Sequence, residues 1–297
     1  MTAGTATRAC RGLACALALV LLGSGCAVGT SGRLAATGGG PRPVCGHASR
    51  PDLEAAAARN GASLYTTPID LFGRPETGWA IYAPMIGRQV ESSCPADTPG
   101  FAEAVARWSL AHGVAADGAV TPDLLMQLKS DWQDRRPFVR LRAQGVCPDP
   151  PPPDELETVP AELTYGDRPL ELRRDALAAW ARLVRDARMA PELAGDAERL
   201  RIFSAVRSPA YYDARCSQEN NCQGVVRAAC SAHRTGLALD VVLDAAPGFA
   251  VDSSADANRL AMTRGPAYRW LVANAGRYGF VNYAFEPWHW EWTGARF

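Results

Sequence analysis

The sequence predicts an α+β fold in which an antiparallel sheet with flanking helices is preceded by a small, mainly helical domain. Within residues 161–297, strand-like and helical stretches follow one another without the regular strand–helix–strand alternation of a parallel sheet. Four consecutive prolines after Asp149 separate this part from an upstream helical pattern. The chain has 297 residues, 47% hydrophobic and 21% charged, which is enough for both parts.

Residues 1–25 have the pattern of a signal peptide. Arg8 and Arg11 precede an uncharged apolar run from Gly12 to Leu22, which is shorter than the ~20 residues of a membrane-spanning helix. The Leu-Gly-Ser-Gly that precedes Cys26 resembles a bacterial lipobox, whose cysteine carries lipid. We therefore expect export to the periplasm or cell envelope, with Cys26 lipidated and this lipid as the only membrane contact. Plain secretion is the alternative.

The mature chain divides at two segments of biased composition. Residues 26–43 are rich in Gly, Thr and Ser and are predicted to form a flexible tether. Residues 149–160 form a proline-rich linker, because consecutive prolines give a stiff spacer that few contacts cross. The sequence thus predicts a small N-terminal domain at 44–148 and a second domain at 161–297.

The small domain shows its clearest pattern from Phe101 to Leu128. Apolar residues recur there at helical spacing up to a stop at Gly113, and after an Asp-Gly turn the Thr-Pro pair at 121–122 predicts a second helix. This hairpin resembles the second half of three-helix peptidoglycan-binding domains, and a purely structural helical pair is the alternative. Residues 60–95 do not fit the first half of that family and stay unassigned.

The second domain contains the elements from which the fold class follows. Helices are predicted at Leu170–Met189 and Pro266–Arg277, where apolar residues fall on one face. Strands are predicted at Leu200–Val206, Leu237–Leu243 and Phe280–Tyr283.

Export also decides how the cysteines are interpreted, because an oxidising compartment favours disulfides. Six cysteines follow the lipobox and can form up to three disulfides, whose pairing remains open: Cys45, Cys94, Cys147, Cys216, Cys222 and Cys230. The alternative is a structural zinc site formed by the last three of these cysteines together with His233. Their spacing lacks the paired Cys-x2-Cys knuckles of such sites.

The charge pattern argues against a nucleic-acid partner. Lys and Arg number 31 and balance 31 Asp and Glu, and no block of like charge supplies the basic stripe that nucleic-acid binding needs. The sequence predicts no particular oligomeric state.

Two of the four histidines stand in sequence contexts that suit a metal site. A turn at Gly236 would bring the imidazole of His233 and the carboxylate of Asp240 to one point. His289 would be a third ligand, and Glu286, three residues earlier, would face a water on the metal. Two imidazoles and one carboxylate leave the fourth tetrahedral position of Zn²⁺ open, as in catalytic sites.

Such a site would hydrolyse a carbonyl compound. Bound Zn²⁺ lowers the pKa of water toward ~7, and a carboxylate such as Glu286 accepts the proton as hydroxide attacks. The oxyanion that forms needs a fixed positive donor, for which Arg207, after a predicted strand, is the candidate. The alternatives are a surface His–Asp pair and an aromatic core edge at residues 288–292.

In chain order these motifs resemble one known family. Ser-x-His-x2-Gly-x-Ala-x-Asp at 231–240, followed by Glu-Pro-Trp-His at 286–289, is similar to the VanY-type D-alanyl-D-alanine carboxypeptidases, zinc peptidases of the hedgehog/DD-peptidase fold. The resemblance covers about residues 165–297 and includes Tyr-Arg-Trp-Leu at 268–271 and Tyr-Gly-Phe-Val at 278–281.

The resemblance implies three Zn²⁺ ligands, namely His233, Asp240 and His289. It also implies that Glu286 is the catalytic base, that Arg207 stabilises the transition state or the substrate carboxylate, and that Ser231 contacts substrate. The implied activity is hydrolysis of the terminal D-Ala-D-Ala bond of peptidoglycan stem peptides. The alternatives are a D,D-dipeptidase, a cell-wall endopeptidase or a non-catalytic peptidoglycan-binding protein.

Overall fold

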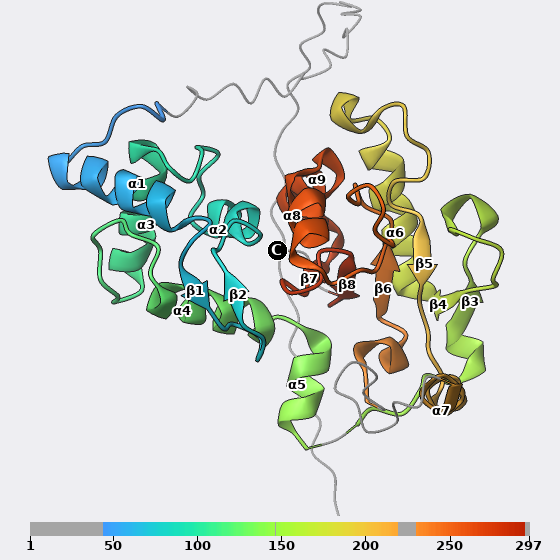
Figure 1. Cartoon of the computed structure of the whole chain (residues 1–297). Helices are drawn as coiled ribbons and strands as arrows, with labels where there is room; N and C mark the ends of the chain where they lie inside the picture. The colour runs from blue at the N-terminus through green and yellow to red at the C-terminus, as the bar shows by residue number, and fades with distance from the viewer. Residues whose placement is uncertain (1–43, 146, 219–229, 295–297) are drawn as a thin grey trace, which may run out of the picture. The chain divides into compact units, whose positions relative to one another are not determined.

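The central element of the fold is a four-stranded antiparallel sheet with the strand order β5-β6-β8-β7 (Figure 1). The structure is a computed structural model and describes residues 44–145, 147–218 and 230–294. The strands of this sheet are β5 (Ile202–Ser204), β6 (Ala238–Val241), β7 (Phe280–Asn282) and β8 (His289–Trp292). The predicted α+β class is confirmed, as are the three predicted strands, but β8 was not expected as a strand.

The two faces of the sheet have different roles because side chains alternate along a strand. Leu239 of β6 and its cross-strand partner Trp290 of β8 belong to the hydrophobic core. Their neighbours Asp240 and His289, also directly opposite each other, therefore point to the other face. The sheet register thus pairs two polar side chains on one face and two apolar ones on the other.

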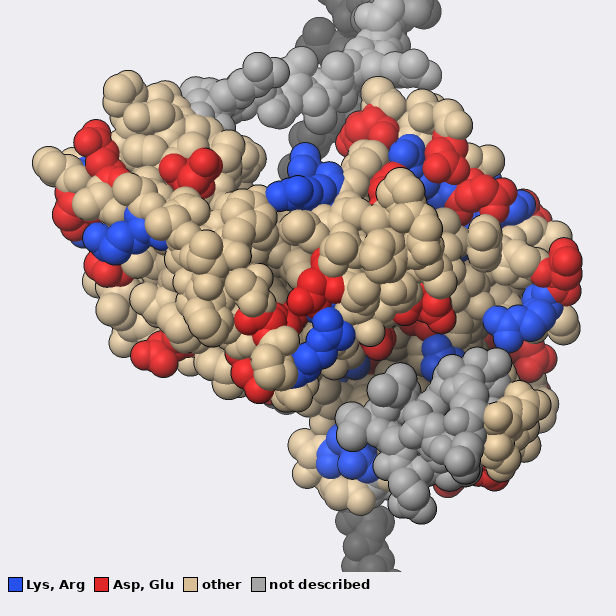
Figure 2. All heavy atoms as spheres, viewed as in Figure 1, with Lys and Arg blue, Asp and Glu red and all other residues tan. Residues whose placement is uncertain are grey.

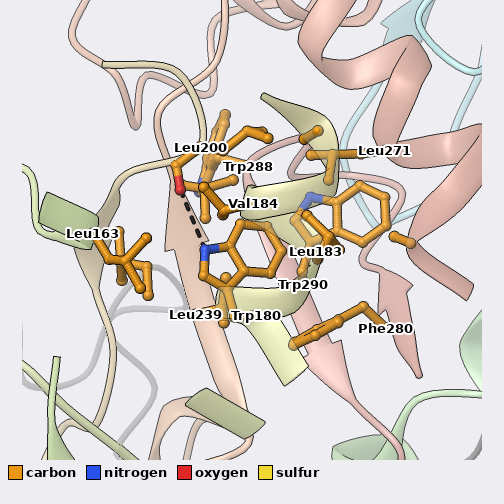
Figure 3. Packing of buried hydrophobic residues seen from close by; sticks show 14 of the residues in the cluster. Leu163, Trp180, Leu183, Val184, Leu200, Leu239, Leu271, Phe280, Trp288 and Trp290 are labelled. Atoms are coloured by element: carbon orange, nitrogen blue, oxygen red, sulfur yellow. Dashed lines mark hydrogen bonds between the residues drawn. The ribbon is translucent and has the colours of Figure 1, made fainter. Parts of the chain in front are cut away.

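Helices α6 (Arg174–Ala187) and α9 (Pro266–Asn274) cover the apolar face. Figure 3 shows Trp180 of α6 among the core side chains, with Phe280 of β7 edge-on to its ring at 5.1 Å between centroids. Both helices were predicted. The first is shorter than expected, because Glu171–Arg173 form strand β4 instead of the first helical turn.

Trp180 also supports an unusual backbone conformation at Leu200. Its indole N–H donates to the carbonyl oxygen of Leu200 at 3.2 Å (Figure 3). Leu200 has φ +66°, a left-handed conformation that costs a residue with a side chain roughly 1–2 kcal/mol. Burial of Leu200, which is 2% exposed, and this hydrogen bond offset the cost just before β5.

Five helices and a two-stranded ribbon make up residues 44–145. They are α1 (Pro51–Ser63), β1 (Pro68–Ile69), β2 (Glu76–Thr77), α2 (Ala83–Gln89), α3 (Pro99–Ala111), α4 (Pro122–Asp134) and α5 (Pro137–Ala143). Each helix has proline in its first two positions, where the fixed φ suits a helix and no N–H is needed. The predicted hairpin corresponds to α3 and α4, and the Thr121 hydroxyl accepts from the N–H of Leu124 to cap α4.

The predicted linker at 149–160 contains regular structure. Strand β3 (Leu156–Thr158) follows the prolines and pairs with β4 (Glu171–Arg173) in an antiparallel ribbon. The described residues from Val44 onward pack as one unit. The division into domains 44–148 and 161–297 stays a prediction.

The remaining helical segments connect these parts. They are η1 (Pro153–Glu155), η2 (Ala161–Leu163), η3 (Pro191–Leu193), α7 (Pro209–Gln218), η5 (Ala232–Thr235), α8 (Asp256–Arg264) and η6 (Ala275–Tyr278).

A buried arginine of α8 links the two parts of the chain. The Arg259 side chain is fully buried and pairs with the Glu76 carboxylate of β2. It also donates to the hydroxyl of Tyr82 at 2.8 Å and to the carbonyl of Phe285 at 2.7 Å. The segment upstream of the linker is therefore tied to the loop that precedes β8.

Two disulfides join Cys45 to Cys94 and Cys147 to Cys230. They confirm disulfides for four of the six cysteines. The alternative zinc site that used Cys230 is wrong, because the sulfur of Cys230 is bonded to that of Cys147. The side chain of Cys216 and all of Cys222 lie outside the described part.

The predicted signal peptide, Cys26 and tether also lie outside the described residues. Among those that the structure describes, no helix combines the length and the apolar character that crossing a bilayer requires. On the face shown in Figure 2, basic and acidic side chains are intermixed, and neither charge dominates a large area of the described surface.

Replacing Trp180 by alanine should lower the free energy of unfolding by about 3–5 kcal/mol, because it leaves a cavity and removes the partner of the Leu200 carbonyl. Denaturant titration measures the change. Met189, just beyond the same helix, is 81% exposed, and Met189→Ala should change stability by less than about 0.5 kcal/mol. Equal effects of the two substitutions would contradict the packing described for Trp180.

Candidate metal centre

A short helical turn brings His233 to the start of β6. Ser231 caps the turn η5, because its hydroxyl accepts from the N–H of His233 at 3.2 Å. Gly236 ends the turn with φ +68°, and a Cβ there would lie 2.8 Å from Cγ of Arg173. The conformation and the close approach both require glycine. The chain then enters β6 and places the carboxylate of Asp240 beside the imidazole.

His289 reaches the same point from β8. It lies opposite Asp240 in the sheet register, and its Nδ1 is 2.8 Å from Oδ1 of Asp240. Nε2 of His233 is 3.2 Å from Oδ2 of the same carboxylate. Ligand atoms of the three residues all lie within 4.8 Å of one another. Within the described ranges, no other group of three or more His, Cys, Asp or Glu residues has this arrangement.

The hydrogen bonds of the two imidazoles leave the right atoms for a cation. Nδ1 of His233 lies 2.7 Å from the carbonyl oxygen of Ala205, so Nδ1 carries the proton and Nε2 offers its lone pair to the cluster. Nε2 of His289 faces a carboxylate oxygen of Glu291 at 3.4 Å, so its Nδ1 is the atom turned to Asp240. Metal-binding histidines are typically fixed in this way through their second nitrogen. The donor set fits one divalent ion.

The electrostatic environment of the cluster keeps one histidine neutral and the other charged. Burial, with help from Arg207, lowers the pKa of His233 to about 4, so this imidazole is neutral at pH 7. Burial also opposes the charge on His289, but its hydrogen bonds to Asp240 and Glu291 outweigh burial and raise its pKa to about 9. Burial disfavours charge on Asp240 as well, yet His233, His289 and Arg207 hold its pKa well below the usual range.

Arg207, which follows β5, supplies a cation at the edge of the cluster. Its Nη2 donates to Oδ2 of Asp240 at 2.6 Å and lies 3.1 Å from Nε2 of His233. Its Nε donates to the hydroxyl of Ser204 at 2.9 Å. Two anchored nitrogens fix the direction of the guanidinium, and 22% of the side chain remains exposed for a further contact.

Glu286 borders the cluster from the loop between β7 and β8. Its Oε2 lies 4.0 Å from Nδ1 of His289, and its side chain is 34% exposed. Partial burial raises the pKa of its carboxyl, and the nearby His289 charge opposes that rise. The carboxylate is thus next to the ligand atoms without being one of the three.

The Ser231 hydroxyl contacts the hydroxyl of Tyr212 in addition to capping η5. These two structural contacts account for its position, and substrate contact remains a prediction. Of the other histidines, His47 is exposed, and His112 is exposed and stacks on the ring of Trp108 with 3.9 Å between centroids.

Asn282 is a positioning residue that the sequence analysis missed. Its amide nitrogen donates to the carbonyl oxygens of Pro287 at 3.2 Å and His289 at 2.8 Å, while its oxygen accepts from the Tyr268 hydroxyl at 3.0 Å. This buried amide clamps the loop that carries Glu286. No local sequence pattern identifies Asn282, because its hydrogen-bond partners come together only in the folded loop.

Residues 170–295 match the family model described as VanY, D-alanyl-D-alanine carboxypeptidase. This segment therefore carries a VanY-type domain, in agreement with the resemblance of its motifs. The match covers less than half of the chain and includes all residues of the candidate site.

Among solved structures, the chain is similar to that of the LdcB LD-carboxypeptidase, whose description concerns the molecular basis of peptidoglycan recognition. The identity is 21%, the TM-score is 0.36, and the alignment covers 49% of this chain and 71% of that chain. The search of curated proteins gave no match.

Binding of a divalent ion should displace one proton from His289. The pKa of about 9 places a proton on Nδ1 below that pH, whereas His233 is already neutral. Between about pH 5 and pH 6, where His233 is already neutral and bound water is not yet ionised, apparent affinity should therefore rise about tenfold per pH unit. Calorimetric titration with Zn²⁺ at pH 6, in two buffers of different ionisation enthalpy, counts the protons. At that pH ionisation of bound water, with a pKa near ~7, adds little. Binding without proton release would refute this charge assignment.

Proposed function

We propose that the protein is an exported zinc-dependent D,D-carboxypeptidase that removes the terminal D-alanine from peptidoglycan stem peptides. The family match supports a peptidase acting on peptidoglycan. The observation that carries the finer proposal is a buried His-Asp-His donor set with an accessible carboxylate, Glu286, and a fixed cation, Arg207, at its border. The two disulfides support an oxidising compartment, and lipidation of Cys26 belongs to the same proposal.

Three residues would hold the ion: His233 through Nε2, Asp240 through its carboxylate and His289 through Nδ1. When bound, Zn²⁺ supplies a Lewis acid for the scissile carbonyl and a water whose pKa is lowered toward ~7. The carboxylate of Asp240 offsets part of the charge of the ion, so that the centre keeps a net positive charge for an anionic transition state.

Glu286 moves the proton. It accepts a proton from the attacking water as the new C–O bond forms, and it returns this proton to the amine nitrogen as the C–N bond breaks. The raised pKa of this carboxyl suits both steps, because a base with a pKa closer to neutrality can also act as an acid.

Arg207 provides positive charge where the reaction or the substrate is negative. A guanidinium beside the ligand set can stabilise the oxyanion, and it can also bind the terminal carboxylate that a carboxypeptidase recognises. The two roles differ in kinetic effect, since the first acts in the transition state and the second already in substrate binding.

A product analysis tests the proposal and its alternatives. Purified protein is incubated with a pentapeptide muropeptide ending in D-Ala-D-Ala, with and without chelator, and the products are weighed. Loss of one alanine that chelator abolishes supports the proposal. Loss of a dipeptide identifies a D,D-dipeptidase, and cleavage of a cross-linked dimer identifies an endopeptidase. A tetrapeptide substrate tests the adjacent L,D bond. If metal-loaded protein cleaves none of these substrates, the result favours the alternative, a non-catalytic peptidoglycan-binding protein.

Glu286→Gln should retain the metal and lose activity. The carboxamide keeps the size of the side chain but accepts no proton, and loss of a general base typically costs ~10²–10⁴ in rate. Metal analysis and turnover measured on the same sample separate the two effects. Asp240→Ala is the comparison and should lose metal and activity together. Wild-type turnover by Glu286→Gln would refute its assignment as base.

Arg207→Ala should retain the metal, and its kinetics should identify its role. An oxyanion donor predicts a fall of about 10²–10³ in kcat with little change in KM. A carboxylate anchor predicts mainly a higher KM. Initial rates over a range of substrate concentrations distinguish these results. Unchanged kcat and KM would exclude Arg207 from both roles.

A further inference from the structure

Arg136 carries a positive charge into the interior from outside the VanY-type segment. It lies between α4 and α5, and its side chain is only 7% exposed. A charge removed from water to this extent costs several kcal/mol unless it is paired with good geometry. The identity of its partner therefore matters.

The partner is Glu291 of β8, whose side chain is 2% exposed. Nε of Arg136 donates to Oε1 at 2.7 Å, and Nη2 lies 2.6 Å from the same oxygen. The other oxygen, Oε2, accepts from the backbone N–H of Phe138 at 3.0 Å. Both carboxylate oxygens are thus held by the junction between α4 and α5, and Gln133 holds Nη1 of the arginine at 3.0 Å.

Glu291 in turn faces His289. The two residues are separated by one position and therefore lie on the same face of β8. Oε1 of Glu291 lies 3.4 Å from Nε2 of the imidazole. A proton on Nε2 that points to this carboxylate keeps Nδ1 turned to Asp240, at 2.8 Å. The Arg136 guanidinium also stacks 4.0 Å from the ring centre of Tyr283, whose ring meets that of His289 edge-on.

We infer that Arg136 is a positioning residue for the metal centre, acting through Glu291 on His289, so that the segment upstream of the linker completes the site. This inference rests on the proposed metal centre. A carboxylate behind a ligating imidazole fixes its tautomer and ring direction and increases its basicity, and loss of such a partner typically costs 10–100-fold in metal affinity. Arg136 keeps that carboxylate charged and in place.

A purely structural role makes a different prediction. Buried ion pairs are weak contributors to stability, because desolvation offsets their attraction. If Arg136 only stabilised the packing of α5, its replacement would change the melting temperature and leave the affinity and coordination of the ion unchanged in the folded protein.

The experiment compares Arg136→Met, Arg136→Lys and Glu291→Gln with wild type in the full mature chain. Zn²⁺ affinity is measured at fixed pH by competition with a chromophoric chelator, and the visible spectrum of the Co²⁺-loaded protein reports the ligand geometry. We expect 10–100-fold weaker Zn²⁺ binding and an altered Co²⁺ spectrum for Arg136→Met and Glu291→Gln. Arg136→Lys, which keeps the charge, should recover part of the affinity.

Arg199→Met is the matched control. Arg199 pairs with Asp244 through Nη2 and Oδ1 at 2.7 Å within the VanY-type segment, but this pair has no contact with the ligand residues among the interactions of the described chain. It should keep wild-type Zn²⁺ affinity within about twofold, since second-shell effects require contact with a ligand.

Wild-type affinity and an unchanged Co²⁺ spectrum in folded Arg136→Met would overturn the inference while leaving the proposed function intact. If that variant does not fold, Glu291→Gln, which keeps the size of the side chain, decides by the same two measurements. Absence of metal binding by the wild-type protein would instead overturn the proposed function and the inference together.

Discussion

The buried carboxylate of Asp240 is the constraint on which the rest of the site depends. At 2% exposure it cannot be hydrated, so its charge requires partners within the protein. Those partners come from three separate segments: His233 from the turn before β6, His289 from β8 and Arg207 from the end of β5. The order of the strands places all three around one anion, and the same arrangement offers a donor set for a cation once His289 has lost its proton.

Strand β8 serves two purposes at once because of its period of two. Trp290 and Trp292 pack with the hydrophobic core, while His289 and Glu291 face the polar site on the other side. The motif at residues 288–292 therefore combines an aromatic core edge with a proposed metal ligand, on opposite faces of the same strand. A shift of one residue in its register would exchange the two faces and remove both the core contact and the proposed ligand.

Two arginines connect the site to the described segment upstream of the linker. Arg136 brings the upstream helices to Glu291, and Arg259 of α8 joins Glu76 of β2 to the carbonyl of Phe285, the residue before Glu286. The upstream segment therefore contacts both the ligand strand and the loop of the proposed base. In a peptidase, its contribution would be to hold the residues of the proposed centre in place. This contribution does not depend on whether the segment also binds the cell wall.

The sequence by itself determined the local features of the site: the glycine turn that follows His233, the strand that carries Asp240, and the short spacing between Glu286 and His289. These are encoded within a few residues by periodicity and turn chemistry. The tertiary structure alone decided that β3 forms within the expected linker, because its hydrogen-bond partners lie in β4. It alone also joined Arg136 to Glu291, 155 positions away, since a contact between distant residues leaves no local pattern and exists only once both segments have packed.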